Sequence, residues 1–225
     1  LSAASDSGSS NSDNLTNDTT PTFTGTAEAN SSVELFTGSA SIGTTIADNS
    51  GNWTHTVQAG SALADGTHSI TAKATDAAGN TSSASPALSL TIDATPPAAP
   101  SSPDLSAASD SGSSNSDNLT NDTTPTFTGT AEANSSVELF AGSTSIGTTT
   151  ADNSGNWSHT VQSASALADG IHSITAKATD AAGNTTSASS ALNLTIDATP
   201  PAAPSSPDLS AASDSGSSNS DNLTN

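Results

Sequence analysis

The residues with the clearest chemical potential form an acidic segment near the start of the chain. Residues 6–18 read DSGSSNSDNLTND, which places three Asp and three Asn among small Ser and Gly residues, with no basic side chain nearby. Calcium takes six to eight hard oxygen ligands, drawn from carboxylates, amides and backbone carbonyls. Because Gly and Ser let the backbone wrap around an ion, the segment predicts a calcium-binding loop.

Two further oxygen-rich positions follow the acidic segment. Residues 76–80 read DAAGN, a tight turn, and Asp93 stands shortly before a proline-rich stretch. The pattern is not an EF-hand, because Gly8 lacks a side-chain oxygen at the third position and no Glu stands at the twelfth. The alternative is a set of solvated loops, since Asp, Asn, Gly and Ser are also ordinary turn formers.

Zinc binding and nucleophilic catalysis find no support in the sequence. The chain has no Cys, and His55 and His68, with their copies His159 and His172, lack the spacing of a zinc site. Ser, His and Asp are all present, but no G-x-S-x-G elbow occurs. The sequence therefore predicts a protein that is not an enzyme.

The charge balance narrows the class of partner. Two Lys or Arg residues stand against 22 Asp or Glu residues, for a formal net charge of −20. This balance argues against nucleic acid, whose phosphates need basic side chains, and against anionic membrane surfaces. No apolar run approaches the roughly 20 residues of a membrane span, so no direct membrane insertion is expected. A strongly acidic surface favours solubility and attracts cations.

The elements that must position these loops are repeated along the chain. Residues 1–36 recur letter for letter at 105–140, and residues 209–225 start the same sequence again. Two near-copies and a fragment indicate that the sequence is part of a longer tandem array. Repetition suits a protein that acts as a spacer, because each added copy increases its length. We divide the chain into repeat 1 (residues 1–95), repeat 2 (residues 96–199) and the start of a third repeat (residues 200–225).

Each repeat alternates small polar with apolar residues in short runs, which is the pattern of half-buried antiparallel strands. One strand is expected before Asp6, because its counterpart from Asp104 follows a proline-rich break. Seven short strands without helices indicate an all-β fold of tandem immunoglobulin-like antiparallel β-sandwiches, joined end to end by short Pro-rich linkers. The other six strands of repeat 1 are expected at residues 20–27, 32–36, 41–47, 52–58, 67–76 and 87–93.

The expected core is thin. Aromatic residues make up 3% of the chain, and there are no Cys to form disulfides. Lack of Cys fits either a reducing compartment or a secreted protein that is held together by other means. A small domain with few large apolar side chains needs outside stabilisation, so bound calcium is expected to contribute to folding.

Consecutive antiparallel strands end at alternate poles of a sandwich, so a count of the strands places the two oxygen-rich turns at opposite poles. The Asp76 turn is expected at the pole that faces the preceding repeat, and Asp93 at the pole that faces the next one. A calcium site at the joint could then combine Asp93 with Asp180 and Glu132. Asp197 would take the role of Asp93 for the following copy.

Five motifs of repeat 1 have close copies in repeat 2: DTTPTFTGTAE from Asp18, DNSGNW from Asp48, LADGTH from Leu63, AKATDAAGN from Ala72 and TIDATP from Thr91. In combination they resemble the Ig-like repeats of giant bacterial surface adhesins, including calcium-dependent RTX-type biofilm and ice-binding adhesins. The resemblance covers essentially the whole chain and is most specific for the extender regions of such proteins. It implies an extracellular, calcium-rigidified β-sandwich rod on the bacterial cell surface.

The resemblance also implies partners, a role and a ligand set. The partners would be calcium ions and neighbouring repeats, and the chain would be a monomeric rod that projects a distal ligand-binding domain from the cell. The alternative is a repeated module that contacts polysaccharide or ice directly, which an exposed aromatic platform would favour. The implied metal ligands are Asp6, Asp13, Asn17, Asp76 and Asp93 with their copies Asp110, Asp117, Asn121, Asp180, Asp197, Asp214 and Asp221, and the expected joint site adds Glu132.

Overall fold

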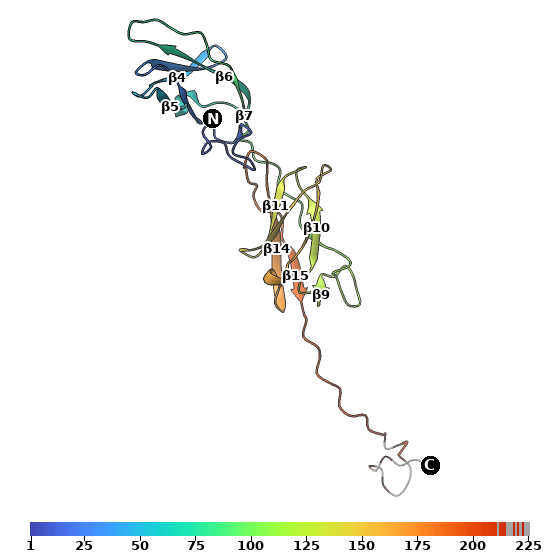
Figure 1. Ribbon diagram of the computed structural model, residues 1–225. Coiled ribbons are helices and arrows are strands. Elements are labelled where there is room, and N and C mark those ends of the chain that lie inside the picture. Colours follow the sequence, from blue (N-terminus) through green and yellow to red (C-terminus); the bar gives the residue numbers. More distant parts are fainter. Residues whose placement is uncertain (211, 215–217, 219, 221, 223–225) are drawn as a thin grey trace.

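The structure is a computed structural model, and it describes residues 1–210, 212–214, 218, 220 and 222. Repeats 1 and 2 each form a separate β-sandwich, and the two sandwiches lie end to end (Figure 1). Beyond repeat 2 the chain continues as an exposed, extended segment over residues 200–208. In the described part of the chain, no helix has the length and apolar character needed to cross a bilayer.

Repeat 1 begins with the acidic loop and then alternates strands with tight turns. Its elements are β1 (Leu15–Thr16), β2 (Thr22–Thr26), β3 (Ser32–Thr37), β4 (Ala40–Ile46), β5 (Asn52–Thr56), the 3-10 turn η1 (Ala59–Ser61), β6 (Gly66–Thr75) and β7 (Leu88–Ile92). One sheet has the order β1-β7-β6-β3-β4, in which the β1–β7 pair is parallel and the others are antiparallel. The facing sheet pairs β2 with β5.

Repeat 2 has the same architecture with one additional strand. Its elements are β8 (Asp104–Leu105), β9 (Leu119–Thr120), β10 (Thr126–Thr130), β11 (Ser136–Ala141), β12 (Thr144–Thr150), β13 (Asn156–Thr160), η2 (Ser163–Ser165), β14 (Gly170–Thr179) and β15 (Leu192–Ile196). The five-stranded sheet, β12-β11-β14-β15-β9, matches that of repeat 1. The facing sheet has three strands, because β8 pairs with the outer edge of β10 to give the order β13-β10-β8.

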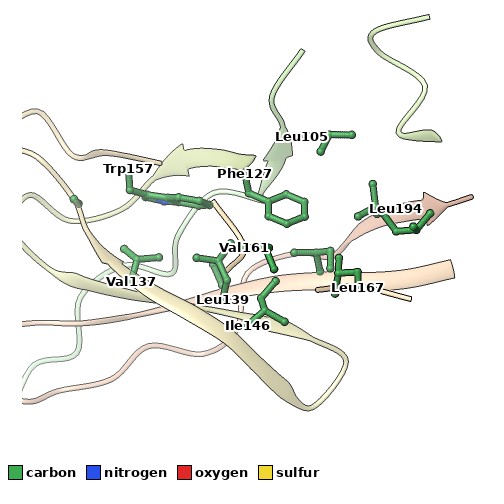
Figure 2. Close-up of a cluster of buried hydrophobic side chains, with 13 residues drawn as sticks. Leu105, Phe127, Val137, Leu139, Ile146, Trp157, Val161, Leu167 and Leu194 are labelled. Carbon is green, nitrogen blue, oxygen red and sulfur yellow. The ribbon is translucent and has the colours of Figure 1, made fainter. Parts of the chain in front are cut away.

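Alternate residues of the facing strands fill the space between the two sheets. In repeat 2 the rings of Phe127 and Trp157 lie over Val137 and Leu139 of the opposite sheet (Figure 2). Phe127, Val137 and Leu139 are completely buried, and full burial of each such side chain stabilises the fold by roughly 1.5–3 kcal/mol. The core of repeat 2 is therefore small but closely packed.

Six of the seven strand predictions for repeat 1 are confirmed, with ends displaced by at most two residues, and the strand expected at Asp104 is β8 of repeat 2. The strand expected before Asp6 is wrong for repeat 1: residues 1–6 form no strand and keep one bond of that kind, from the amide of Ser2 to the carbonyl of Thr22, and the seventh strand is β1 inside the acidic segment. The count of seven strands per repeat is wrong for repeat 2, which has eight, because β9 forms inside the acidic segment and pairs with β15. A two-residue strand is too short to show alternation. The single turns η1 and η2 also depart from the expectation of no helix.

Candidate metal centre and the joint between repeats

The acidic segment folds as a compact loop at one pole of each sandwich. In repeat 1 the amide of Asp6 donates to the carbonyl of Ser2 at 3.1 Å, and the amide of Asn14 donates to Asp6 Oδ2 at 3.2 Å. The hydroxyl of Thr16 donates to the carbonyl of Ser5 at 2.6 Å. These bonds close the loop around the carboxylate of Asp6, which is only 5% exposed.

One oxygen of this buried carboxylate has no partner. Among the described residues, Oδ1 of Asp6 is buried and accepts no hydrogen bond, and the same holds for Oδ1 of Asp110 and Asp214. Its recurrence in three copies makes this feature a property of the loop sequence. A buried polar atom without a partner destabilises the fold by about 1–3 kcal/mol, and more when it is charged. Asp221, another predicted ligand, lies outside the described residues.

The chain itself offers these carboxylates no positive group. Its two basic residues, Lys73 and Lys177, lie on β6 and β14, where each ammonium stands 5.7 Å from the ring centre of Phe36 or Phe140. In the part of the chain that the structure describes, no three His, Cys, Asp or Glu side chains come together as a metal site. A hard cation at Asp6 would therefore have one buried carboxylate oxygen and otherwise neutral oxygens as its ligands, which is chemistry that calcium accepts.

The other predicted ligands of the loop accept hydrogen bonds within it. Asp13 Oδ1 accepts from the amide of Leu15 at 3.1 Å, and Asn17 Oδ1 lies 2.8 Å from Ser7 Oγ, whose one proton it shares with the carbonyl of Ala182. These bonds fix the ends of the loop. The copies Asp117 and Asn121 accept the matching bonds in repeat 2.

The DAAGN turn is buried in one repeat and open in the other. Asp76 accepts from the backbone amide and the side-chain amide of Asn80, both at 2.8 Å, and the side-chain bond is the largest cause that lowers the pKa of Asp76. Asp180 makes matching contacts with Asn184 at 2.9 and 2.8 Å. Asn80 is exposed, whereas Asn184 is 7% exposed. Because the two turns have the same sequence, the neighbouring repeat causes the difference.

Direct hydrogen bonds join the acidic loop of repeat 1 to the DAAGN turn of repeat 2. The approach is close: a Cβ atom added to Gly8 would lie 2.0 Å from the carbonyl oxygen of Ala181. The joint thus depends on a residue without a side chain. The bonds across it run from Ser7 Oγ to the carbonyl of Ala182 (2.7 Å), from the amide of Ser9 to the carbonyl of Ala181 (3.2 Å), and from Asn184 Nδ2 to the carbonyl of Asp93 (2.7 Å).

Two of the three residues expected in a joint calcium site lie close to each other in the structure. Asp93 and Asp180 both contact Asn184, the first through its carbonyl and the second through its carboxylate. Glu132 is exposed, and no cluster of three carboxylates forms among the described residues. The amide of Asn184 thus lies between the two Asp residues. Asp197, the counterpart of Asp93, accepts from the amide of Thr199 at 3.3 Å.

Sequence reasoning missed three polar residues that build the joint. Ser7 and Asn184 carry two of the bonds across it, and Asp65 holds the chain where it leaves repeat 1. Nothing in the sequence distinguishes Ser7 from the many other Ser residues. Asn184 ends the DAAGN turn, and Asp65 stands in the LADGTH motif, so both were visible only as turn formers.

Asp65 supports a pH-dependent prediction. Its Oδ1 accepts from the amide of Ala94 at 2.9 Å and its Oδ2 from the hydroxyl of Thr95 at 2.5 Å; the Thr95 bond is the largest cause that lowers its pKa below the ordinary 3.8. A lowered folded-state pKa stabilises the fold above about pH 3.8, and this contribution is lost as the pH falls through the folded-state pKa. Asp65→Asn should therefore lower the melting temperature at pH 7, and the difference from wild type should shrink below pH 3.8.

The control for this prediction is Asp104→Asn, which removes the same charge from an exposed position on β8. Melting curves of the three proteins from pH 7 to pH 3 separate the local bonds from the general effect of net charge. An Asp65→Asn difference that stays constant across this range would contradict a role for the ionised carboxylate.

Comparison with known families agrees with the two sandwiches. Residues 1–94 and 97–198 each match the bacterial Ig-like domain family, one match for each repeat. The chain is a tandem of bacterial Ig-like domains. The search of curated proteins gave no match for this tandem.

Solved structures similar to these Ig-like domains include a set of fibronectin(III)-like modules and two adhesin segments. The fibronectin(III)-like modules of Clostridium thermocellum CbhA are 14% identical, with 82% of this chain and 92% of that chain covered and a TM-score of 0.46. A Ca²⁺-stabilised adhesin of an Antarctic bacterium that binds ice is 25% identical (78% and 43% covered, TM-score 0.40). A tetra-tandem repeat from the extending region of a large adhesion protein is 27% identical (83% and 48% covered, TM-score 0.35). The tandem thus spans less than half the length of both adhesin chains.

Repeat 1 therefore combines two features at the pole that faces repeat 2. One is a buried carboxylate oxygen that has no partner in the described residues. The other is a loop that bonds directly to the next domain. Asp6 and Ser7 are adjacent in that loop, so a group that binds the Asp6 carboxylate would also restrict Ser7, which bonds to repeat 2.

Proposed function

We propose that the chain is a structural extender module of a bacterial cell-surface adhesin, in which tandem Ig-like domains form a rod that calcium stiffens. The joint is the observation that carries this proposal. Consecutive domains are hydrogen-bonded to each other at three points instead of being separated by a loose tether. In arrays of this kind each unit contacts its neighbours, so length grows with copy number and stability follows the contacts between neighbours.

The linker supports a stiff connection. Pro100 and Pro103 are buried, and the amide of Ser101 donates to the carbonyl of Thr130 at 2.9 Å. Ser101 Oγ in turn accepts from the amide of Thr130 at 2.9 Å. Proline fixes φ and reduces the freedom of the chain. The linker is thus docked along repeat 2, which limits bending between the domains.

The proposed calcium contribution acts through the same loop. An ion at Asp6 would satisfy a buried oxygen that the protein leaves without a partner, and it would fix the loop from which Ser7 and Ser9 reach the next repeat. Without the ion, the uncompensated buried charge would favour opening of the loop. Removal of calcium would then soften the joint as well as destabilise each domain.

The alternative function, direct binding of polysaccharide or ice, receives no support from the aromatic residues. Phe23, Phe127 and Trp157 are buried in the two cores, at 3% exposure or less. Phe36 and Phe140 are only half-buried, but each lies beneath a Lys ammonium. Trp53 is half-buried and lines a groove of repeat 1, but a single indole is not an extended surface, so the described residues present no aromatic platform. The placement on the cell surface rests on the resemblance to adhesin extender repeats and on the acidic character of the chain.

Calcium titration of the intact chain tests the proposal. A site that binds only the folded state stabilises it by about 2.7 kcal/mol at a hundredfold excess over Kd, and each kcal/mol shifts Tm of a small domain by roughly 4–8 °C. Calcium should therefore raise Tm by on the order of 10–20 °C relative to EDTA. Small-angle scattering should show a narrower range of particle shapes in calcium than in EDTA.

Paired variants locate the effect. Asp6→Asn with Asp110→Asn should remove most of the calcium-dependent rise in Tm, because both buried carboxylates are neutralised. Asp48→Asn with Asp152→Asn is the matched control, since it removes two carboxylates that cap exposed hairpin turns. If Tm and scattering were the same with calcium and with EDTA, the calcium part of the proposal would be wrong. If both pairs of variants lost the calcium-dependent rise in Tm to the same extent, the ion could not be assigned to Asp6 and Asp110.

A further inference from the structure

Two Asp-Gly pairs carry reactive chemistry that the proposed function does not use. Of the 16 Gly residues in the chain, only Gly66 and Gly170 follow an Asp, and none follows an Asn. Because Gly has no side chain, its backbone nitrogen is the least hindered nucleophile that can stand after an Asp. These two pairs are therefore the places where an Asp side chain is most open to attack by the main chain.

The attack leads to a rearrangement that needs no reagent other than water. The amide nitrogen of Gly66 forms a bond to Cγ of Asp65, the bond between Cγ and its hydroxyl breaks, and water leaves with the amide proton. The product is a five-membered succinimide ring. Addition of water at the main-chain carbonyl of residue 65 opens the ring to isoaspartate, whereas addition at Cγ restores Asp. Nothing is oxidised or reduced, and the mass of the chain is unchanged.

The turn at this position requires a Gly residue. Gly66 begins β6 with φ of +126°, and Gly170 begins β14 with φ of +133°, values that Gly adopts more readily than any other residue. Nothing lies within 4 Å of a Cβ added to either residue, and Asp65 and Gly66 are both exposed. A succinimide ring therefore has room to form, and a bulkier residue after Asp65 would strain the turn.

In the folded protein both oxygens of the Asp65 carboxylate are already held. Oδ1 accepts from the amide of Ala94 at 2.9 Å, and Oδ2 accepts from the hydroxyl of Thr95 at 2.5 Å. We call this pair of bonds, and the matching pair in repeat 2, the exit clasp. The donors lie between β7 and the linker segment, residues 96–104. Ring closure expels one carboxylate oxygen, so at least one bond of the exit clasp must be lost on the way to the ring.

The exit clasp also favours the unreactive form of the side chain. The bond from Thr95 is the largest cause that lowers the pKa of Asp65 below 3.8, followed by the bond from Ala94. A nitrogen attacks a neutral carboxylic acid, which can release water, far more readily than it attacks a carboxylate anion. The two bonds therefore oppose the rearrangement both by holding the oxygens and by keeping the group ionised.

Repeat 2 has the same arrangement. Asp169 Oδ1 accepts from the amide of Ala198 at 2.9 Å, and Oδ2 accepts from the hydroxyl of Thr199. The pairing of the strands is also the same, because Gly170 lies opposite Ile196 as Gly66 lies opposite Ile92. The exit clasp is thus a property of the repeat sequence.

We propose that Asp65-Gly66 and Asp169-Gly170 are sites of spontaneous Asp isomerisation, and that the exit clasp protects them in the folded chain. In isoaspartate the free carboxylate is attached directly to Cα, and the main chain gains a methylene group at the start of β6 or β14. The exit clasp could not form in that geometry. The chain would then lose an anchor where repeat 1 leads into the linker segment. The proposal depends neither on calcium nor on the location of the protein.

Ageing of the folded chain at neutral pH, with calcium held constant, tests the proposal. An endoprotease that cuts before Asp but not before isoaspartate reports the extent of isomerisation at each site. One digest reads both sites separately, because the peptide from repeat 1 contains Thr67 where the peptide from repeat 2 contains Ile171.

Two variants serve as controls for each other. Thr95→Val replaces the hydroxyl donor with a methyl group and leaves repeat 2 unchanged. Loss of one hydrogen bond to a charged group should speed isomerisation at Asp65 roughly tenfold, with no change at Asp169 in the same molecule. Thr199→Val should give the opposite result, with a faster reaction at Asp169 alone.

The denatured chain supplies the reference rate. In denaturant the exit clasp is absent, so wild type and both variants should isomerise equally fast at a given site, and faster than the folded wild type. Calorimetry of the folded samples shows whether each variant retains its melting transitions, and the second variant gives an independent measurement if the first does not fold. Folded wild type that isomerises as fast as the denatured chain would overturn the proposal. So would folded variants in which neither site reacts faster than in wild type.

Discussion

Replacement of Gly8 with Ala is expected to separate the two repeats while leaving each of them folded. The new Cβ would lie 2.0 Å from the carbonyl oxygen of Ala181 and 2.8 Å from the carbonyl carbon of Ala182. Backbone atoms cannot turn aside as a flexible side chain can, so the joint must open. The three bonds across it contribute about 0.5–1.5 kcal/mol each, and their loss should lower the coupling between the repeats by about 2–4 kcal/mol.

Gly112→Ala is the matched control for this prediction. Gly8 and Gly112 occupy the same position of the acidic loop, with φ of +94° and +100°, but nothing lies within 4 Å of a Cβ added to Gly112. The strain of a non-Gly residue at positive φ is therefore common to both variants. Only Gly8→Ala adds the clash with the neighbouring repeat.

Spin-label distances measure the joint directly. The chain has no Cys, so Ser50→Cys and Ser154→Cys, two exposed equivalent positions, can be labelled specifically. The distance distribution should be narrow in wild type and in Gly112→Ala, and broad in Gly8→Ala. Equal distributions in all three proteins would mean that the contact between Gly8 and Ala181 does not hold the joint.

Replacement of Gly129 with Ala is expected to destabilise repeat 2 more than Gly25→Ala destabilises repeat 1. At both positions the added Cβ would lie 2.4 Å from Cζ2 of the neighbouring Trp. Trp53 faces an open groove and can move, whereas Trp157 is 3% exposed, and Ser101 Oγ would lie 2.9 Å from the new Cβ at residue 129. Overpacking of a closed core costs about 1–3 kcal/mol, occasionally more, so we expect about 3 kcal/mol at Gly129 and about 1 kcal/mol at Gly25.

Calorimetric unfolding of the two variants gives this comparison. Gly60→Ala serves as the control, because nothing lies within 4 Å of a Cβ there and repeat 2 carries Ala164 at the same position. That substitution should be close to neutral. Equal losses for Gly25→Ala and Gly129→Ala would contradict the view that the docked linker segment tightens the core of repeat 2.

Much of the fold could be predicted from sequence because it depends on local patterns. Alternation of apolar and polar residues located Val33 and Leu35 on the inner face of β3, and both are 1% exposed. Turn residues such as Gly38, with φ of +58°, set the hairpins between the strands. The candidate site was predicted less completely. The acidic loop could be recognised by composition, but the single buried oxygen of Asp6 could not.

What the sequence by itself determined is the repeated β-sandwich, the placement of carboxylates in loops and the absence of basic partners for them, because these follow from periodicity and composition. The tertiary structure alone decided that the acidic loop also meets the DAAGN turn, that Ser7 and Asn184 carry bonds across the joint, and that Glu132 stays exposed. It also decided that identical residues are covered in repeat 2 and open in repeat 1. The physical reason is that burial and hydrogen bonding across a joint depend on atoms far apart in the chain. Two identical sequences can therefore differ in burial and in hydrogen bonding only because their neighbours differ.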